Sequence, residues 1–301
     1  MINAVRTPEA RFAALPGFPW AARYAEDLPG FAGLRGAYID EGPRAADHTF
    51  LCLHGEPTWS FLYRKMIPVF LGAGARVVAP DFLGFGRSDK PVEVGDYSFH
   101  FHRDYLLRLT ERLDLRSITL VCQDWGGLLG LTLPLDQGFA PRLTRLLVMN
   151  TALAVGAAPS EGFVAWRTYC RANPDLPVGT LMKRSTPMLT EAEVAAYEAP
   201  FPDVRYKAGV RAFPELVMTE PDMPGVAESR AAAAFWSQNW SGPTFMAVGA
   251  ADPVLGPPVM AALRATIRGC PEPMVIAEAG HFVQEWGGPI AEATLKAFAG
   301  A

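Results

Sequence analysis

Short apolar runs, spaced along the whole chain, constrain the fold more than any other feature of the sequence. They cover residues 49–53, 75–80, 117–122, 143–149, 244–248 and 274–277. Runs that are apolar almost throughout are typical of strands buried on both faces of a parallel sheet. Segments with helical spacing lie between most of them, for example residues 102–113 and 259–267. This alternation predicts an α/β fold with a mostly parallel, doubly wound sheet.

The alternation stops between residues 151 and 230. Prolines divide this stretch into short helical pieces, and no strand-like run occurs in it. The prolines are Pro159, Pro174, Pro177, Pro187, Pro200, Pro202, Pro214, Pro221 and Pro224. We therefore expect a helical cap at residues 151–230, inserted into a core domain that is made of residues 1–150 and 231–301.

Composition excludes several classes of partner. The chain has 301 residues, 50% of them hydrophobic, which is enough for one large core. The net charge is −4, and no block of like charge is long enough to follow a nucleic acid or to coat a membrane surface. We expect neither nucleic acid nor membrane as a partner, and we expect a monomer.

The cysteines and the first thirty residues indicate a cytoplasmic protein. Cys52, Cys122, Cys170 and Cys270 are scattered, with no paired spacing for zinc and no small scaffold to cross-link. Charged residues interrupt residues 1–30, so the apolar core of a secretory signal is missing, and no stretch approaches a membrane span. We expect reduced thiols, and neither a metal nor another cofactor.

The segment at residues 118–127 carries the strongest chemical signal. An apolar strand run leads to Gln123 and Asp124, and Trp125, two glycines and an apolar helix follow. This order is typical of a nucleophile elbow, a sharp turn that holds one side chain above a sheet. A carboxylate is ionised at neutral pH and attacks carbon without an activating base, so Asp124 would form an ester. An ordinary helix N-cap is the alternative interpretation of Asp124.

Hydrolysis of such an ester needs a base and a group that orients it. His281 follows the last apolar run in a short loop with Gly280, and it is the best candidate for the base. Asp252 follows the run at 244–248 and would orient the imidazole, although an aspartate before a proline is also a common turn former. Asp136 and Asp175 are the alternative acids.

A second strand-end loop completes the predicted site. Glu56 follows His54 and Gly55 directly after the run at 49–53. The backbone N–H groups of Glu56 and Trp125 would form the oxyanion hole when water attacks the ester. The Glu56 side chain would be available as an ion-pair partner within its loop, and His54 is interpreted as structural.

With these residues identified, the chain resembles the haloalkane dehalogenases over its whole length. The resemblance rests on HGEPTWS at residues 54–60, DFLGFGRSDKP at 81–91, QDWGG at 123–127 and GHFVQE at 280–285. It is closest to the subfamily whose acid follows the strand before the histidine loop. It implies an α/β-hydrolase fold and hydrolysis of a small halogenated alkane by water to an alcohol, a halide ion and a proton.

The resemblance also implies a halide site made of two indole N–H donors, from Trp125 and from Trp166 of the cap. A halide is a weakly basic leaving group that needs polarised donors rather than a proton. A tryptophan that only packs on the core is the alternative for Trp166. The residues that the resemblance places around the substrate are Phe163, Leu128, Pro214, Val217 and Leu255.

Three other functions share parts of this pattern. An epoxide hydrolase would use the same nucleophile but needs a pair of cap tyrosines for its alkoxide leaving group, and Tyr169, Tyr197 and Tyr206 are available. A fluoroacetate dehalogenase would carry an arginine pair after the nucleophile, and the sequence has none there. A ligand-binding relative without activity is a third possibility, because a fold alone does not fix function.

Overall fold

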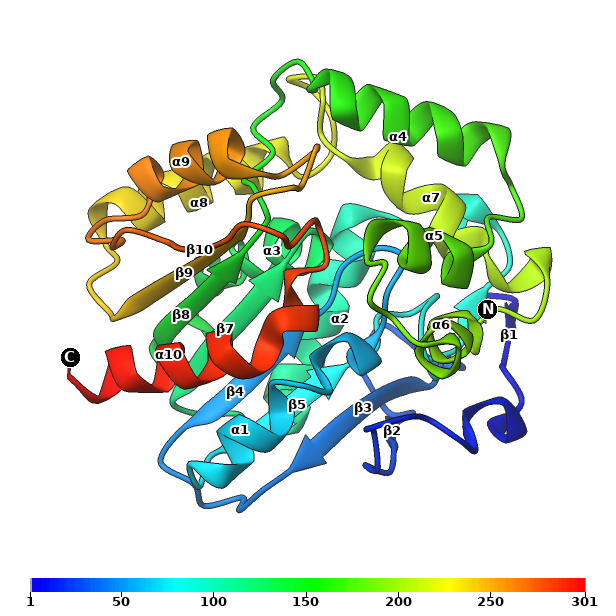
Figure 1. The fold of residues 1–301 in the computed structure, drawn as a ribbon, viewed down its shortest axis with the longest axis horizontal. Helices are drawn as coiled ribbons and strands as arrows, with labels where there is room; N and C mark the ends of the chain where they lie inside the picture. Colours follow the sequence, from blue (N-terminus) through cyan, green and yellow to red (C-terminus); the bar gives the residue numbers. More distant parts are fainter. Residues whose placement is uncertain (1, 301) are drawn as a thin grey trace.

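A mixed sheet of eight strands forms the centre of the protein in a computed structural model, which describes residues 2–300 (Figure 1). The two outermost positions of the predicted core ranges, Met1 and Ala301, lie outside the described residues. The strand order is β10-β9-β8-β7-β4-β5-β3-β2. The strands are β2 (Arg23–Ala25), β3 (Gly36–Glu41), β4 (Thr49–Leu53), β5 (Arg76–Pro80), β7 (Ile118–Gln123), β8 (Leu143–Met149), β9 (Thr244–Gly249) and β10 (Met274–Ile276). A separate antiparallel pair joins β1 (Ala4–Val5) to β6 (Lys90–Pro91).

All six apolar runs form strands, and these six pair in parallel from β5 to β10. The α/β class predicted from the sequence is thereby confirmed. Two antiparallel strands, β3 and β2, extend the sheet at one edge. The sequence pattern missed β3 because Asp40 and Glu41 end its apolar run. Asp40 is nonetheless buried, where the guanidinium of Arg76 in β5 donates two hydrogen bonds of 2.7 and 3.0 Å to its carboxylate.

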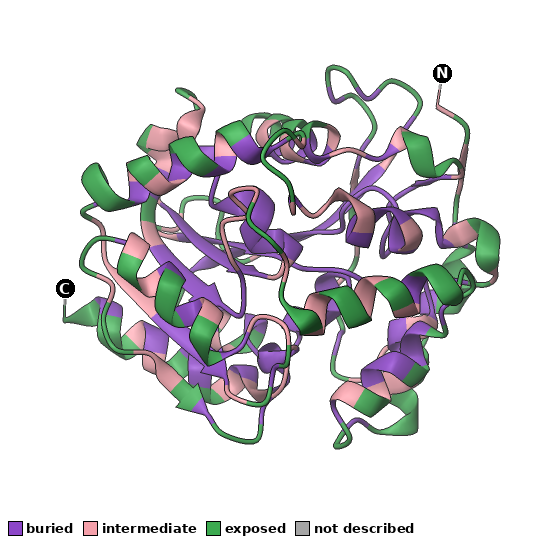
Figure 2. Ribbon diagram, turned by 90° about the horizontal axis from the view of Figure 1, so that it is seen from above, coloured by how far each residue is buried: buried purple, intermediate pink, exposed green. Residues whose placement is uncertain are grey.

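Helices cover both faces of the sheet (Figure 1). On one face α1 (Ile67–Gly72) packs against α10 (Gly287–Ala299), and on the other α2 (Phe99–Arg112) packs against α3 (Trp125–Gly130). Every residue of β4 and β7 is buried, as expected for central strands covered on both sides (Figure 2). The remaining core helices, α8 (Val226–Gln238) and α9 (Pro257–Thr266), pack against each other.

The stretch predicted to form the cap contains a group of helices between β8 and β9 (Figure 1). It contains α4 (Glu161–Ala172), α5 (Val178–Ser185), α6 (Glu191–Glu198) and α7 (Ala208–Leu216), with α4 packed on α7 and α5 on α6. The predicted limit at residue 230 falls inside α8, which packs on α9 and on the 3-10 turn at Leu133–Leu135 of the core. We therefore propose that the cap ends before α8. None of the helices described between residues 2 and 300 is both long and apolar enough to cross a membrane.

Candidate active site

The turn between β7 and α3 has the geometry of a nucleophile elbow. Asp124 has φ 49° and ψ −125°, a left-handed conformation that is costly for a residue with a side chain. A hydrogen bond of 2.9 Å from its N–H to the carbonyl of Asn150 holds the turn against β8. A Cβ atom at Gly126 would overlap the carbonyl oxygen of Leu53, so only glycine lets the helix pack this closely. The strained turn leaves the Asp124 carboxylate at the carboxyl edge of the sheet.

The loop after β4 supplies one hydrogen-bond donor to that carboxylate. The backbone N–H of Glu56 lies 2.8 Å from Oδ2 of Asp124. His54 is fully buried behind the loop, and its Nε2 accepts a hydrogen bond of 2.9 Å from the N–H of Phe82. Because burial lowers the pKa of His54 to about 3, this imidazole is neutral and holds the loop in place.

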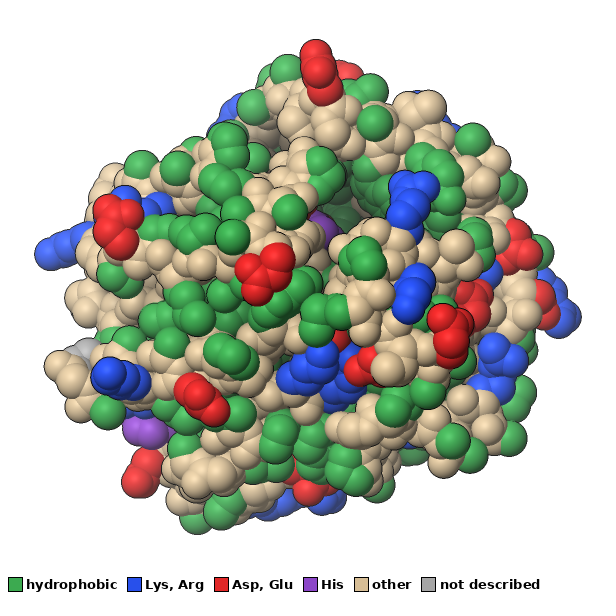
Figure 3. All heavy atoms as spheres, viewed as in Figure 1, with side chains coloured by type: hydrophobic (Ala, Val, Ile, Leu, Met, Phe, Trp, Pro, Cys, Tyr) green, Lys and Arg blue, Asp and Glu red, His purple; other side chains and the backbone are tan. Residues whose placement is uncertain are grey.

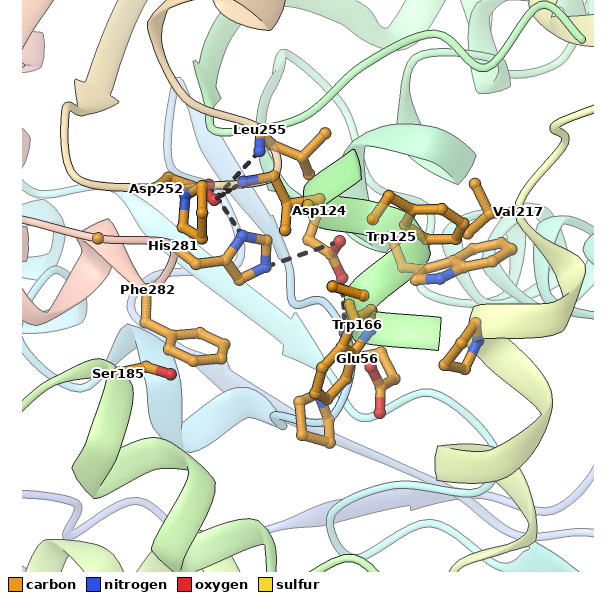
Figure 4. A pocket seen from close by; sticks show the side chains of 18 of the residues that line it. Glu56, Asp124, Trp125, Trp166, Ser185, Val217, Asp252, Leu255, His281 and Phe282 are labelled. Atoms are coloured by element: carbon orange, nitrogen blue, oxygen red, sulfur yellow. Dashed lines mark hydrogen bonds and ion pairs between the residues drawn. The ribbon is translucent and has the colours of Figure 1, made fainter. Parts of the chain in front are cut away.

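The predicted base and acid are in contact with each other. Nδ1 of His281 lies 2.9 Å from Oδ2 of Asp252, and Nε2 of the same ring lies 3.7 Å from Oδ1 of Asp124 (Figure 4). Asp252 is held in turn, because its Oδ1 accepts hydrogen bonds of 2.8 and 3.1 Å from the N–H groups of Val254 and Leu255. The three side chains thus form a row from acid to base to nucleophile.

Charge shifts the pKa of each member of this row. Burial alone would lower the pKa of His281, but the charge and the hydrogen bond of Asp252, followed by the charge of Asp124, raise it to about 9. Burial would raise the pKa of Asp252, but His281 and the two loop amides lower it to about 2. Burial raises the pKa of Asp124, and His281 together with the N–H groups of Trp125 and Glu56 opposes that rise. At neutral pH the resting site therefore contains an imidazolium between two carboxylates.

Two residues that the sequence reasoning did not assign also hold the row. The amide nitrogen of Gln123, fully buried at the end of β7, donates a hydrogen bond of 3.0 Å to the carbonyl oxygen of His281 and also lies 3.0 Å from Nε2 of the same residue. The side-chain amide of Asn150, directly after β8, donates a hydrogen bond of 2.9 Å to Oδ2 of Asp252. The sequence signal that could have identified these two residues is a polar side chain at the end of a buried parallel strand. Which loop each residue meets depends on strand order, which spacing along the chain does not give.

A cavity of about 580 Å³ opens in front of Asp124, between the core and the cap. The space-filling view shows the hollow, with a histidine side chain visible inside it (Figure 3). Every residue predicted for the site lines this cavity: Glu56, Asp124, Trp125, Leu128, Phe163, Trp166, Pro214, Val217, Asp252, Leu255 and His281. The alternative acids lie elsewhere, since Asp136 accepts hydrogen bonds from its own loop and Asp175 pairs with Lys207.

Five of the seven tryptophans fall into two groups. The indole N–H groups of Trp59, Trp236 and Trp240 donate to protein oxygens at 2.7 to 3.2 Å, as is usual for buried packing residues. Trp125 and Trp166 line the cavity instead, and neither indole N–H meets a protein acceptor within the described residues. Both donors are free for a ligand in the cavity (Figure 4).

The alternative interpretations fit this geometry less well. Of the three cap tyrosines only Tyr169 lines the cavity, while Tyr197 is fully buried and bonded to Glu285, so the tyrosine pair of an epoxide hydrolase is not formed. The ion pair considered for Glu56 is also missing from residues 2–300. Burial and the nearby charge of Asp124 raise the pKa of Glu56 well above its ordinary value, which disfavours an ionised carboxylate there.

Comparisons with known proteins agree with this site. The family model described as "alpha/beta hydrolase fold" matches residues 48–288. Fold and site thus define an α/β hydrolase with an aspartate at its elbow. A haloalkane dehalogenase from Mycobacterium marinum is 43% identical over 96% of this chain and 97% of that protein, and one from Psychrobacter cryohalolentis is 42% identical over 94% of each. The chain belongs to the haloalkane dehalogenase family.

A solved structure gives the same result in three dimensions. The haloalkane dehalogenase DpaA from Paraglaciecola agarilytica NO2 superimposes with a TM-score of 0.96 and 52% identity, over 98% of both chains. That protein is described as tetrameric. The monomer expected from the sequence receives no support from it.

Proposed function

We propose that this protein is a haloalkane dehalogenase that hydrolyses carbon–halogen bonds through an ester on Asp124. The observation that carries the proposal is one cavity that places an ionised carboxylate opposite two indole N–H groups without protein acceptors. Such donors stabilise a departing halide in a site that excludes most water. The products are an alcohol, a halide ion and a proton.

In the first step a carboxylate oxygen of Asp124 attacks the carbon that bears the halogen, and the carbon–halogen bond breaks as the ester bond forms. Trp125 and Trp166 donate their indole N–H groups to the halide. No proton moves in this step, so His281 remains an imidazolium beside the reacting carboxylate. We assign Phe163, Leu128, Pro214, Val217 and Leu255 to the apolar wall that orients the alkyl chain.

The second step follows from the loss of charge in the first. Esterification removes the negative charge of Asp124, which is one of the causes that raise the pKa of His281. The imidazolium therefore releases its proton more readily and becomes the base that activates water. The proton that His281 has released leaves to solvent, and His281 then takes one proton of the water that attacks the ester carbonyl, while the N–H groups of Glu56 and Trp125 hold the oxyanion. The tetrahedral intermediate breaks its bond to the oxygen of the alkyl group, which leaves as the alcohol with the second proton of the water. Asp124 is again a carboxylate, and Asp252 stabilises the imidazolium that re-forms.

A substitution at the base tests the proposal. His281→Gln should complete the first step and stop, because no base activates the water. Incubation with 1-bromobutane should then increase the intact mass of the protein by one butyl group, located on the peptide that contains Asp124. The double variant Asp124→Asn, His281→Gln should gain no mass. If His281→Gln also stays unmodified while the wild type releases bromide, catalysis does not pass through an ester.

We also propose that the chain associates beyond the monomer, in view of the relative described as tetrameric. Light scattering coupled to gel filtration measures this, and a mass of one chain at all concentrations would contradict it. A cytoplasmic location is proposed as well, because all four cysteines are free thiols in the structure, as is usual in a reducing compartment.

A further inference from the structure

The lining of the cavity is mostly apolar, and its charged side chains are those of Glu56, Asp124, Asp252 and His281, around the elbow, and of Arg184, on α5. Asp124, Asp252 and His281 form one end. From there an aromatic strip runs along α4, where the rings of Trp166 and Tyr169 stack with centroids 6.2 Å apart. The guanidinium of Arg184, in the last turn of α5, lies 5.4 Å from the centroid of the Tyr169 ring. Arg184 thus ends the strip that begins at the proposed halide site.

Arg184 has no compensating charge. Among the residues that line the cavity it is the only lysine or arginine, and nothing between residues 2 and 300 forms an ion pair or hydrogen bond with it. Its neighbour Lys183, in contrast, pairs with Glu191. Ser185 follows Arg184 on the cavity wall, and its hydroxyl also lacks a protein partner among the described residues. Figure 4 shows Ser185 on the opposite side of the cavity from Trp125, and Figure 3 shows basic side chains beside the hollow.

The two ends carry opposite charge. At neutral pH the inner end holds the carboxylates of Asp124 and Asp252 and the imidazolium of His281, so its net charge is negative. Arg184 gives the other end a positive charge. An anionic group on a substrate is repelled from Asp124 and attracted to Arg184. The field therefore selects the orientation in which a halogenated carbon enters first and the anionic group stays at the outer end.

We propose that Arg184 is a specificity-determining residue that binds a carboxylate at the end of the substrate remote from the halogen, so that the site prefers linear ω-halogenated carboxylates to neutral haloalkanes of equal length. The inference rests on the proposed dehalogenase function and names the class of substrate that the site selects. Guanidinium groups bind carboxylates through two parallel N–H donors, which suits a fixed anchor at the end of an apolar channel.

Matched substrates test this inference. We would measure bromide release from 6-bromohexanoate, from the neutral amide 6-bromohexanamide and from 1-bromohexane. The wild type should show kcat/KM for the carboxylate about 2- to 5-fold above that for the amide, as expected for a partly exposed ion pair. The difference should lie mainly in KM, because the anchor acts on binding. It should shrink as salt is raised, because ions screen exposed charges.

Two variants separate Arg184 from the general charge of the surface. Arg184→Gln should abolish the preference for the carboxylate. Arg167→Gln is the matched control, because Arg167 also lies over an aromatic ring, Phe163 at 5.5 Å, but does not line the cavity. That variant should keep the preference of the wild type.

The outcomes are distinguishable. Turnover of 1-bromohexane without preference for the carboxylate, or a preference that survives in Arg184→Gln, would overturn the role of Arg184 and leave the dehalogenase proposal intact. Release of bromide from none of the three substrates would overturn the dehalogenase proposal, and this inference with it.

Discussion

Replacing Asp252 with asparagine removes one charge from the row of three residues while keeping nearly the same shape. Both oxygens of Asp252 accept from donors: Oδ1 from the N–H groups of Val254 and Leu255, and Oδ2 from Asn150 and His281. An asparagine must turn its NH₂ group toward one of these pairs, and two donors then face each other. Either the loop loses its hydrogen bonds to the side chain at position 252, or His281 loses the acceptor that keeps its proton on Nδ1.

The structure gives the size of the electrostatic effect. The pKa of His281 stands at about 9 instead of 6.5, and at about 1.4 kcal/mol for each tenfold change in equilibrium this equals about 3 kcal/mol. Since Asp252 contributes most to the increase and burial opposes it, we expect the pKa in Asp252→Asn to fall to 6.5 or below. The base would also be misoriented, which lowers the rate of comparable triads by about 10⁴.

Two measurements check this prediction. NMR titration of the imidazole should give a pKa near 9 for the wild type and at least two pH units lower for Asp252→Asn. Rapid-mixing kinetics with a bromoalkane should show a burst of one bromide per enzyme followed by very slow turnover. Asp136→Asn is the control, because Asp136 bonds only to its own loop. An unchanged pKa, or turnover within tenfold of the wild type, would refute the role given to Asp252.

Three further predictions follow from the same structure. The value of kcat should fall as the pH drops through the pKa of His281 in the ester intermediate, which lies below about 9. The value of kcat/KM reports the attack by Asp124 and should stay level over the same pH range. A parallel loss of both would contradict this order of steps. Trp166→Phe should lower kcat/KM for a chloroalkane about 10- to 100-fold, because one hydrogen bond to a charged group is lost. Trp286 lies outside the cavity, and an equal effect of Trp286→Phe would exclude a specific role of Trp166 in halide binding. Asp40→Ala should lower the free energy of unfolding in urea by about 3 to 5 kcal/mol, because it leaves Arg76 buried without a partner, and a loss below 1 kcal/mol would count against a buried pair.

The parallel strands could be predicted from the sequence because they are buried on both faces, which makes them continuous apolar runs. β3 could not, because Asp40 lies in it and its burial depends on Arg76, a residue 36 positions away in β5. Sequence periodicity records which residues are apolar but not which charged residues are paired. The limit that we propose for the cap, before α8, could not be predicted for a similar reason, since it depends on the packing of that helix on α9.

The functional site likewise contains residues that the local sequence predicts and residues that only the fold reveals. Asp124, Asp252 and His281 follow apolar runs in order along the chain, and glycines mark the elbow, so each could be located from local sequence. The roles of Gln123 and Asn150 could not, because each acts on a loop more than 100 residues away that strand order brings to it. The environment of Arg184 could not be predicted either, because only the fold shows that its guanidinium lies beside Tyr169 with no ion-pair partner among the described residues.

The central claim is that the oxygen added to the substrate comes first from Asp124 and not from water. A single turnover with excess enzyme in ¹⁸O-labelled water tests it directly. The first alcohol released should contain ordinary oxygen, and the peptide carrying Asp124 should gain one ¹⁸O atom. An alcohol labelled in the first turnover, with Asp124 unlabelled, would show that water attacks the halogenated carbon directly.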